Sequence, residues 1–158
     1  MDRRTFLAST AAVGSVGLAG CAAGDGGDGT ASTTGADGTE TYDIGMTTRR
    51  FEPARLEIEP GTNVVWKNTS AHAHTVTAYY EDLPEGGAFF STGDFIDTED
   101  AREGWRNGTG GALYQGETFD HRFEVVGEFP YFCIPHEASG MAGTIVVTED
   151  ATTATTDS

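Results

Sequence analysis

Apolar and polar residues alternate with a period of two along three stretches in the middle of the chain. The apolar positions of these stretches, with one histidine in the same register, are Tyr42, Ile44, Met46, Leu56, Ile58, Phe119, His121, Phe123 and Val125. A period of two is the spacing of side chains on one face of a β-strand. Two further apolar runs lie at 63–68 and 143–148, and turn residues stand at Pro60, Gly61 and Gly127. Short strands separated by turns predict an all-β sandwich.

The stretch from about 81 to 115 interrupts this alternation. Its phenylalanine and tryptophan residues, which lie among glycines and acidic residues, are Phe89, Phe90, Phe95 and Trp105. This content is too aromatic for a disordered loop and too irregular for a pair of strands, so we expect an ordered insertion that decorates the sandwich. Residues 98–106 are predicted to form a short helix, with Asp97 or Thr98 as its N-cap and with Trp105 packed inward.

The start of the chain has the pattern of an export signal. Arg3 and Arg4 precede an apolar stretch at 5–20, which is shorter than the roughly 20 residues that a transmembrane helix needs. The arginine pair resembles a twin-arginine signal, and the sequence Leu-Ala-Gly-Cys at 18–21 resembles a lipobox. We therefore predict a lipoprotein signal peptide at 1–20 and lipid attachment at Cys21. The alternative is a plain cleavable signal with an incidental cysteine.

Two segments have too few large apolar residues to form a core. Residues 21–41 are almost wholly glycine, alanine, threonine, serine and aspartate, and residues 150–158 have a similar composition. Such segments do not bury enough apolar surface to offset the entropy lost on ordering. We expect a flexible acidic tether at 21–41, one folded domain at 42–149 and a disordered tail at 150–158.

The charge of the chain is strongly acidic and poor in lysine. There are 25 acidic and 9 basic residues, which gives a formal charge of −16, and Lys67 is the one lysine among eight arginines. A polyanion would be repelled by such a surface, so nucleic acid is excluded as a partner. Acidic excess with little lysine is typical of proteins that stay soluble in concentrated salt, where charge repulsion is screened. We hypothesise a halophilic source; the alternatives are an ordinary solvated surface and a docking face for a basic partner.

The residues with the clearest chemistry lie near the end of the folded region. Cys133, His136 and Met141 have the spacing C-x2-H-x4-M. A thiolate, an imidazole and a thioether together suit copper, and two histidines, one cysteine and a more distant methionine are the ligands of a blue-copper site. His74 is the best candidate for the second histidine, because it precedes an apolar run that begins at Thr75. His72 is the alternative, and we expect it in a loop near the site.

Three other polar residues are candidate sites. His121 follows the strand register of its apolar neighbours, so we expect a packed or hydrogen-bonded strand histidine rather than a ligand. Asn68 and Asn107 match the short acceptor pattern for N-glycosylation. The sequence leaves their occupancy open.

The segment 131–141, together with His-Thr-Val at 74–76, resembles the small blue-copper proteins of the plastocyanin and halocyanin family over about residues 42–149. The resemblance implies a cupredoxin-like Greek-key β-sandwich. It also implies that one copper ion, cycling between Cu(I) and Cu(II), is bound by His74, Cys133, His136 and Met141. The implied activity is the transfer of one electron at a time between membrane-associated redox proteins.

The export signal, Cys21 and the acidic, lysine-poor surface are similar to halocyanins of salt-loving archaea in particular. Two features depart from the plant plastocyanins. The stretch 81–115 is longer, and Thr75 stands where those proteins carry an asparagine. Their partner-docking surfaces are therefore not transferred to this chain.

These features together predict a non-enzymatic electron carrier, lipid-anchored to the outer face of the cell membrane. Four protein ligands leave no open position for a small-molecule substrate, unlike a catalytic metal site. Electrons are expected to pass through the edge of His136, where Ile134, Pro135, Ala138 and Gly140 offer a small apolar contact for transient docking of donor and acceptor proteins.

Three other functions are compatible with part of this pattern. A copper-binding or copper-delivery protein of the envelope would have a more accessible, methionine-rich site, whereas Met46 and Met141 are the two methionines after the predicted signal. An enzyme domain of a copper reductase or oxidase would need further histidines or a second cysteine near Cys133. A zinc site is possible with the same residues, although methionine is a poor zinc ligand.

Overall fold

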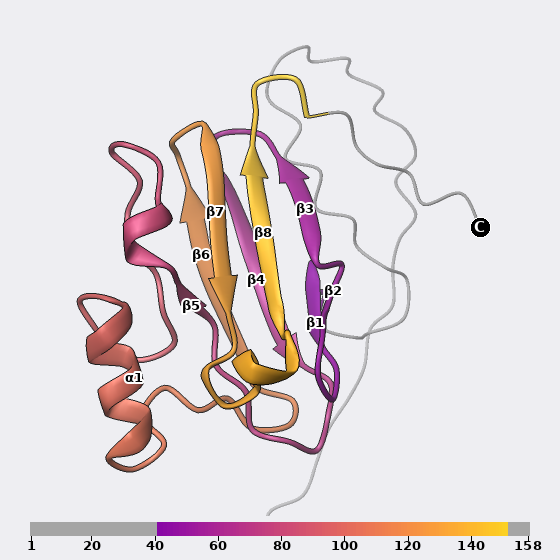
Figure 1. Ribbon diagram of the computed structural model, residues 1–158. Helices are drawn as coiled ribbons and strands as arrows, with labels where there is room; N and C mark the ends of the chain where they lie inside the picture. Colours follow the sequence, from indigo (N-terminus) through magenta and orange to yellow (C-terminus); the bar gives the residue numbers. More distant parts are fainter. Residues whose placement is uncertain (1–40, 152–158) are drawn as a thin grey trace, which may run out of the picture. The chain divides into compact units, whose positions relative to one another are not determined.

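The computed structural model describes residues 41–151 (Figure 1). The predicted signal peptide, Cys21, nearly all of the predicted tether and most of the predicted tail lie outside these residues. The elements in chain order are β1 (Ile44–Met46), β2 (Phe51–Glu52), β3 (Arg55–Ile58), β4 (Thr62–Asn68), β5 (Thr77–Ala78), the 3-10 helix η1 (Tyr80–Asp82), α1 (Thr98–Arg106), β6 (Thr118–Phe123), β7 (Gly127–Phe132), the 3-10 helix η2 (Ile134–Ser139) and β8 (Ala142–Val147). Within the described part of the chain, no helix is both long and apolar enough to cross a membrane.

The strands form two four-stranded sheets, which confirms the predicted all-β sandwich (Figure 1). One sheet has the order β2-β1-β4-β6 and the other the order β3-β8-β7-β5. The pairs β1–β4 and β3–β8 are parallel, and the remaining pairs are antiparallel. Parallel pairing needs a crossover between the two strands, and here the chain between them visits the other sheet.

The core lies between the two sheets and is built from the alternating apolar positions. Ile44, Met46 and Val64 are fully buried, whereas Tyr42, which has the same parity, is 42% exposed beyond the edge of the core. Trp66 on β4 is fully buried and lies against aromatic rings from both sheets and from the insertion. These rings are Phe90, Phe119, Phe123 and Tyr131, with centroids 5.5–6.2 Å from that of the indole.

The insertion between β5 and β6 is ordered, and its helix has the predicted bounds. Asp97 caps α1 by accepting a hydrogen bond from the N–H of Asp100 at 2.8 Å. Ala101 is the buried residue of the helix, and Trp105 is only partly buried, so the expectation that Trp105 packs inward holds in part. The insertion also contributes Phe90, which is 3% exposed, to the core of the sandwich.

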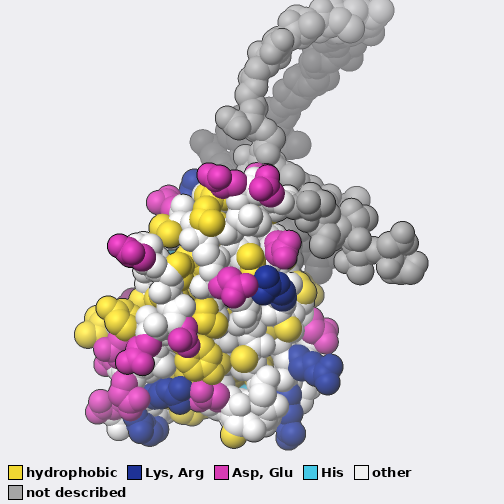
Figure 2. Space-filling model, turned by 45° about the horizontal axis from the view of Figure 1, so that its top comes forward, with side chains coloured by type: hydrophobic (Ala, Val, Ile, Leu, Met, Phe, Trp, Pro, Cys, Tyr) yellow, Lys and Arg dark blue, Asp and Glu magenta, His cyan; other side chains and the backbone are white. Residues whose placement is uncertain are grey.

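The surface of the folded part carries acidic side chains over the face shown in Figure 2, spread between apolar and polar groups rather than gathered into one patch. Several of them pair with arginines. Arg55 binds Glu128 at 3.1 Å and Arg106 binds Glu99 at 2.6 Å, both in solvent-exposed positions. Such exposed pairs contribute little to stability, at most about 1 kcal/mol each.

Candidate copper site

Three of the four residues predicted as metal ligands meet at one end of the sandwich. His74 lies in the loop after β4, Cys133 directly follows β7 and His136 lies in η2. The thiol sulfur of Cys133 is 3.5 Å from Nδ1 of His74 and 3.4 Å from Nδ1 of His136. The ligand atoms of the three residues all lie within 4.8 Å of one another. One metal ion can therefore be reached by all three side chains.

Met141, the fourth predicted ligand, is fully buried at the return of the same loop. The N–H of Cys133 donates to the carbonyl of Met141 at 3.0 Å, and the N–H of Met141 donates to the carbonyl of His136 at 3.2 Å. Gly140 makes this tight return possible, because its φ of 81° lies in the left-handed region that glycine adopts without strain. The loop thus brings the methionine back beside the cysteine.

His74 is fixed from both its backbone and its ring. Its N–H and carbonyl exchange two hydrogen bonds with Leu113, at 3.0 and 2.7 Å, and Nε2 of the ring is 2.8 Å from Oγ of Ser70. Burial, and then the neighbouring His136 and His72, lower the pKa of His74 to about 4. The imidazole is therefore neutral at pH 7, which is the form that binds a metal.

Asn68 and Ser70 support His74, and the sequence did not identify either of them for this role. The side-chain amide of Asn68 donates to the carbonyls of His72 and Leu113 at 2.6 and 2.9 Å, and its Oδ1 accepts from the N–H of Ser70 at 2.8 Å. Asn68 is fully buried, so its amide serves the fold here. The sequence analysis noted Asn68 only because residues 68–70 match the acceptor pattern for N-glycosylation, and that pattern says nothing of a contact with His74.

Cys133 is buried in a setting that suits a cation nearby. Burial raises the pKa of its thiol to about 11, although the N–H of Thr75 donates to the sulfur at 3.4 Å and opposes this shift. Thr75 also accepts a hydrogen bond from the N–H of Ile134 at 2.8 Å through its hydroxyl. A metal cation favours the thiolate over the thiol, so the donor set, two neutral imidazoles and one enclosed sulfur, fits a soft metal ion.

His136 is the half-buried member of the cluster, whereas His74 and Cys133 are fully buried. Its ring lies 4.8 Å from that of His74 and 6.3 Å from that of His72, measured between centroids. Burial is the main cause that lowers the pKa of His136, followed by the charges of His72 and Arg49. His72 itself is exposed and lies outside the three-residue group.

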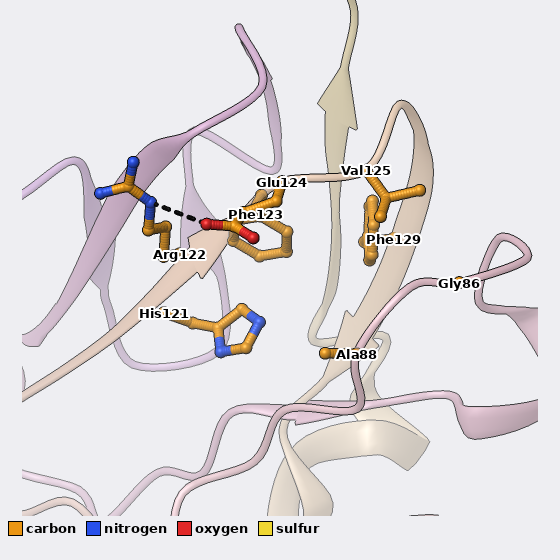
Figure 3. Close-up of a pocket in the computed structure, with 8 residues that line it drawn as sticks. All are labelled: Gly86, Ala88, His121, Arg122, Phe123, Glu124, Val125 and Phe129. Carbon is orange, nitrogen blue, oxygen red and sulfur yellow. Dashed lines mark ion pairs between the residues drawn. The ribbon is translucent and has the colours of Figure 1, made fainter.

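His121 lies on β6, away from this cluster. Its ring stacks on Phe90, with centroids 4.9 Å apart and planes at 25°, and meets Phe123 edge-on at 4.9 Å. Figure 3 shows it among the residues that line a small pocket near the turn between β6 and β7. The pocket has a volume of about 130 Å³. Burial lowers the pKa of His121. It is a packed strand histidine, as its register in the sequence suggested.

Comparison with known proteins gives the same family as the motif. Residues 40–148 match the model of the copper-binding proteins of the plastocyanin/azurin family. The chain belongs to this family. It is 29% identical over 97 residues to plastocyanin of Scenedesmus fuscus, which covers 61% of this chain and 85% of that protein. It is 28% identical over 99 residues to the chloroplastic plastocyanin of Tetradesmus obliquus, covering 61% of this chain but only 57% of that protein.

Among solved structures, similar chains include amicyanin from Paracoccus versutus and a purple cupredoxin from Nitrosopumilus maritimus. The amicyanin has a TM-score of 0.49 and 17% identity, covering 69% of this chain and 82% of the other. The purple cupredoxin has a TM-score of 0.42 and 22% identity, covering 67% of this chain and 100% of the other.

With the family known, copper is confirmed as the cofactor predicted from the sequence, and the cluster of His74, Cys133, His136 and Met141 is its type 1 site.

Proposed function

We propose that this cupredoxin is a one-electron carrier with a mononuclear type 1 copper site. The observation that carries the proposal is the approach of two imidazole Nδ1 atoms to one buried thiol sulfur, at 3.4 and 3.5 Å, with Met141 buried at the return of the same loop. Copper bound to two histidines and a cysteine, with a weak axial thioether, changes between Cu(I) and Cu(II) with little change of geometry. In this assignment Met141 would supply the weak thioether ligand.

The hydrogen bonds around His74 agree with Nδ1 as its ligand atom. If Nδ1 binds the metal, Nε2 carries the proton and donates it to Oγ of Ser70. The hydroxyl of Ser70 then donates to Oδ1 of Asn68, 3.1 Å away, and both amide protons of Asn68 are already used on carbonyls. Every proton in this series of hydrogen bonds, from His74 through Ser70 to Asn68, has an acceptor. Such outer contacts fix the orientation of a ligating histidine.

The enclosure of the site favours electron transfer over substrate chemistry and over metal exchange. Cys133, His74 and Met141 are fully buried, so four ligands would surround the ion and leave no open position for a substrate. A copper-delivery protein would need faster access to its ion than this burial offers. We therefore propose a carrier that is not an enzyme.

Electrons would enter and leave through His136, because its ring is the partly exposed one of the ligand set. Ile134 and Pro135 beside it are partly exposed, and Ala138 and Gly140 are exposed. This small apolar rim suits brief contact with donor and acceptor proteins. We take these to be membrane-associated redox proteins.

The anchoring part of the proposal rests on the sequence. The twin-arginine-like signal and the lipobox-like sequence ending at Cys21 support export and a lipid anchor on the outer face of the membrane. Together with the formal charge of −16 and a single lysine, they support a halocyanin-like carrier adapted to salt. A rising melting temperature with added salt would support the salt adaptation, and loss of structure in salt would contradict it.

The absorption spectrum of the oxidised, copper-loaded protein tests the site. We expect an intense visible charge-transfer band, its loss in Cys133→Ser and its retention in the matched variant Cys21→Ser. His74→Ala should likewise remove the band, and His72→Ala should keep it. Equal spectra of the parent chain and Cys133→Ser would contradict the ligand assignment, and a colourless ion that exchanges rapidly with a chelator would favour copper delivery.

A further inference from the structure

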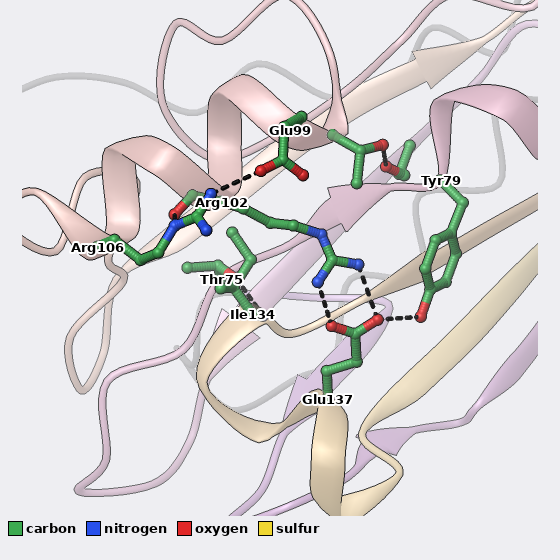
Figure 4. Close-up of polar contacts among 9 residues, drawn as sticks. Thr75, Tyr79, Glu99, Arg102, Arg106, Ile134 and Glu137 are labelled. Atoms are coloured by element: carbon green, nitrogen blue, oxygen red, sulfur yellow. Dashed lines mark hydrogen bonds and ion pairs between the residues drawn. The ribbon is translucent and has the colours of Figure 1, made fainter.

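The insertion helix reaches the loop that carries His136 and contacts it through one pair of charged side chains (Figure 4). Arg102 of α1 donates from Nη1 to Oε2 of Glu137 at 2.6 Å and from Nη2 to Oε1 at 2.9 Å. Two parallel bonds of this kind fix both the distance and the orientation of the carboxylate. Glu137 directly follows His136 in η2.

A third residue completes this contact from the end of β5. The hydroxyl of Tyr79 donates to Oε1 of Glu137 at 3.0 Å, and burial raises the pKa of Tyr79 to about 12, so the phenol keeps its proton at neutral pH. The ring of Tyr79 stacks on Phe132 with centroids 4.3 Å apart, and the guanidinium of Arg102 lies 4.6 Å from the centroid of Phe132. Phe132 directly precedes Cys133. The contacts therefore involve the chain neighbours of two ligands.

The helix is itself anchored, so Arg102 is presented from a fixed base. Oγ1 of Thr98 donates to the carbonyl of Ala78 at 2.8 Å and accepts from the N–H of Tyr80 at 2.8 Å. Arg102 lies four residues after Thr98, one helical turn further along the same face. The side chains of Arg102 and Glu137 are 31% and 32% exposed, so water screens this ion pair less than the exposed pairs of the surface.

From these contacts we propose that Arg102 and Glu137, with Tyr79, form a clamp in which Arg102 is a positioning residue for His136. The inference rests on the proposed copper site. The backbone of η2 already has its own hydrogen bonds, from Gly140 to Glu137 and from Met141 to His136. The clamp therefore holds a loop that folds without it, and its contribution is to limit the movement of that loop. The insertion thus becomes part of the site although it supplies no ligand.

The test compares two double variants, each of which removes one positive and one negative side chain and so leaves the net charge unchanged. Arg102→Gln with Glu137→Gln removes the clamp, and Arg106→Gln with Glu99→Gln removes a pair on the same helix whose side chains are 62% and 73% exposed. Amide hydrogen exchange is measured in the copper-free protein. In the clamp variant the amides of Gly140 and Met141 should exchange about tenfold faster, with β4 amides unchanged, because only the loop opens more often. The control variant should match the parent chain at every amide.

A second readout uses the copper-loaded protein. The clamp variant should show a broadened or shifted visible band and faster release of copper to a chelator, and Tyr79→Phe, which keeps the stacked ring, should fall between it and the parent. Equal exchange rates at Gly140 in the two double variants, or faster exchange over the whole sheet, would overturn the inference. Failure of the copper assignment would appear instead in the Cys133→Ser spectrum, so the two outcomes are separable.

Discussion

Both ends of the sandwich contain histidine rings that are at least partly buried, but only the copper end brings other metal-binding groups close to them. At the copper end, formed by the loops 69–76 and 133–141, the rings of His74 and His136 face one sulfur. At the far end, near the β6–β7 turn, His121 stacks on Phe90. Burial lowers the pKa of His74 at the copper end and the pKa of His121 at the far end. A buried histidine with a lowered pKa is thus not a metal site by itself; hydrogen bonds that hold its ring toward a second metal-binding atom make the difference.

The largest effect is expected from the residue that orders the copper end. Asn68→Ala leaves the carbonyls of His72 and Leu113 without their donor, so we expect a loss of about 2–3 kcal/mol in the free energy of unfolding. Chemical denaturation of the copper-free protein measures it. Asn63→Ala, at an exposed position of the same strand, is the matched control and should change stability little. Similar losses of stability in both variants would show that the side-chain hydrogen bonds of Asn68 add nothing beyond what any residue of β4 contributes.

A smaller change should act on the metal more than on the fold. Ser70→Ala removes the hydroxyl that meets Nε2 of His74, and we expect copper affinity to fall about 10- to 100-fold because the ring loses its orienting partner. Competition with a chelator measures the affinity. Ser139→Ala, at an exposed position of η2, serves as the control. Unchanged affinity in Ser70→Ala would mean that the backbone bonds between His74 and Leu113 are enough to hold His74 in place.

The far end should respond to pH and leave the metal unaffected. Burial lowers the pKa of His121 in the fold, while the same histidine in the unfolded chain takes up a proton near the ordinary histidine pKa of about 6.5. The contribution of His121 to the free energy of unfolding is therefore complete above that pH. It falls as the pH drops below that value, because the unfolded chain then binds a proton that the folded chain binds less well. His121→Phe should lose less stability than the parent chain between pH 7.5 and 5.5, measured on copper-free protein, with the visible band of the loaded protein unchanged. A changed band would mean that the two ends are coupled.

The smallest effect is expected from an ion pair on the surface of the far end. Arg122 and Glu124 lie 3.3 Å apart with side chains 62% and 73% exposed. Arg122→Gln should change the free energy of unfolding by less than about 0.5 kcal/mol, because water and salt screen such pairs. Thermal unfolding at two salt concentrations checks this. A large loss would show that the pocket beside His121 depends on this pair.

The sequence predicted what is encoded locally. The period of two identified β1, β3 and β6, and the apolar runs identified β4 and β8, because burial on one face is a property of each segment; β2 and β7 were not predicted. Cys133, His136 and Met141, whose spacing predicted one site, lie in a single loop between β7 and β8. The helix at 98–106 followed from its cap and its composition. In each case the residues that form the element also carry its signal.

The partners of the ligands were not predictable, because they come from distant parts of the chain. Leu113 meets His74 from the far side of the insertion, and Arg102 meets Glu137 across 35 positions. Nothing in a serine or an arginine taken alone says which ring or carboxylate it will reach. Trp105 illustrates the same limit, since it was predicted to pack inward and the surrounding insertion buries it only in part.

The place of β1 has a mechanical consequence. This strand, the first of the described chain, is bonded to β2 on one side and runs parallel to β4 on the other, from Ile44 opposite Trp66 to Met46 opposite Asn68. A pull applied through Thr41 along the strand would load these bonds together in shear instead of peeling them apart one by one. The folded domain would then resist a pulling force applied at its amino-terminal side, because β1 transmits that force to β4 through several bonds at once. The last residue of β4, Asn68, also holds the loop of His74 through its side-chain hydrogen bonds.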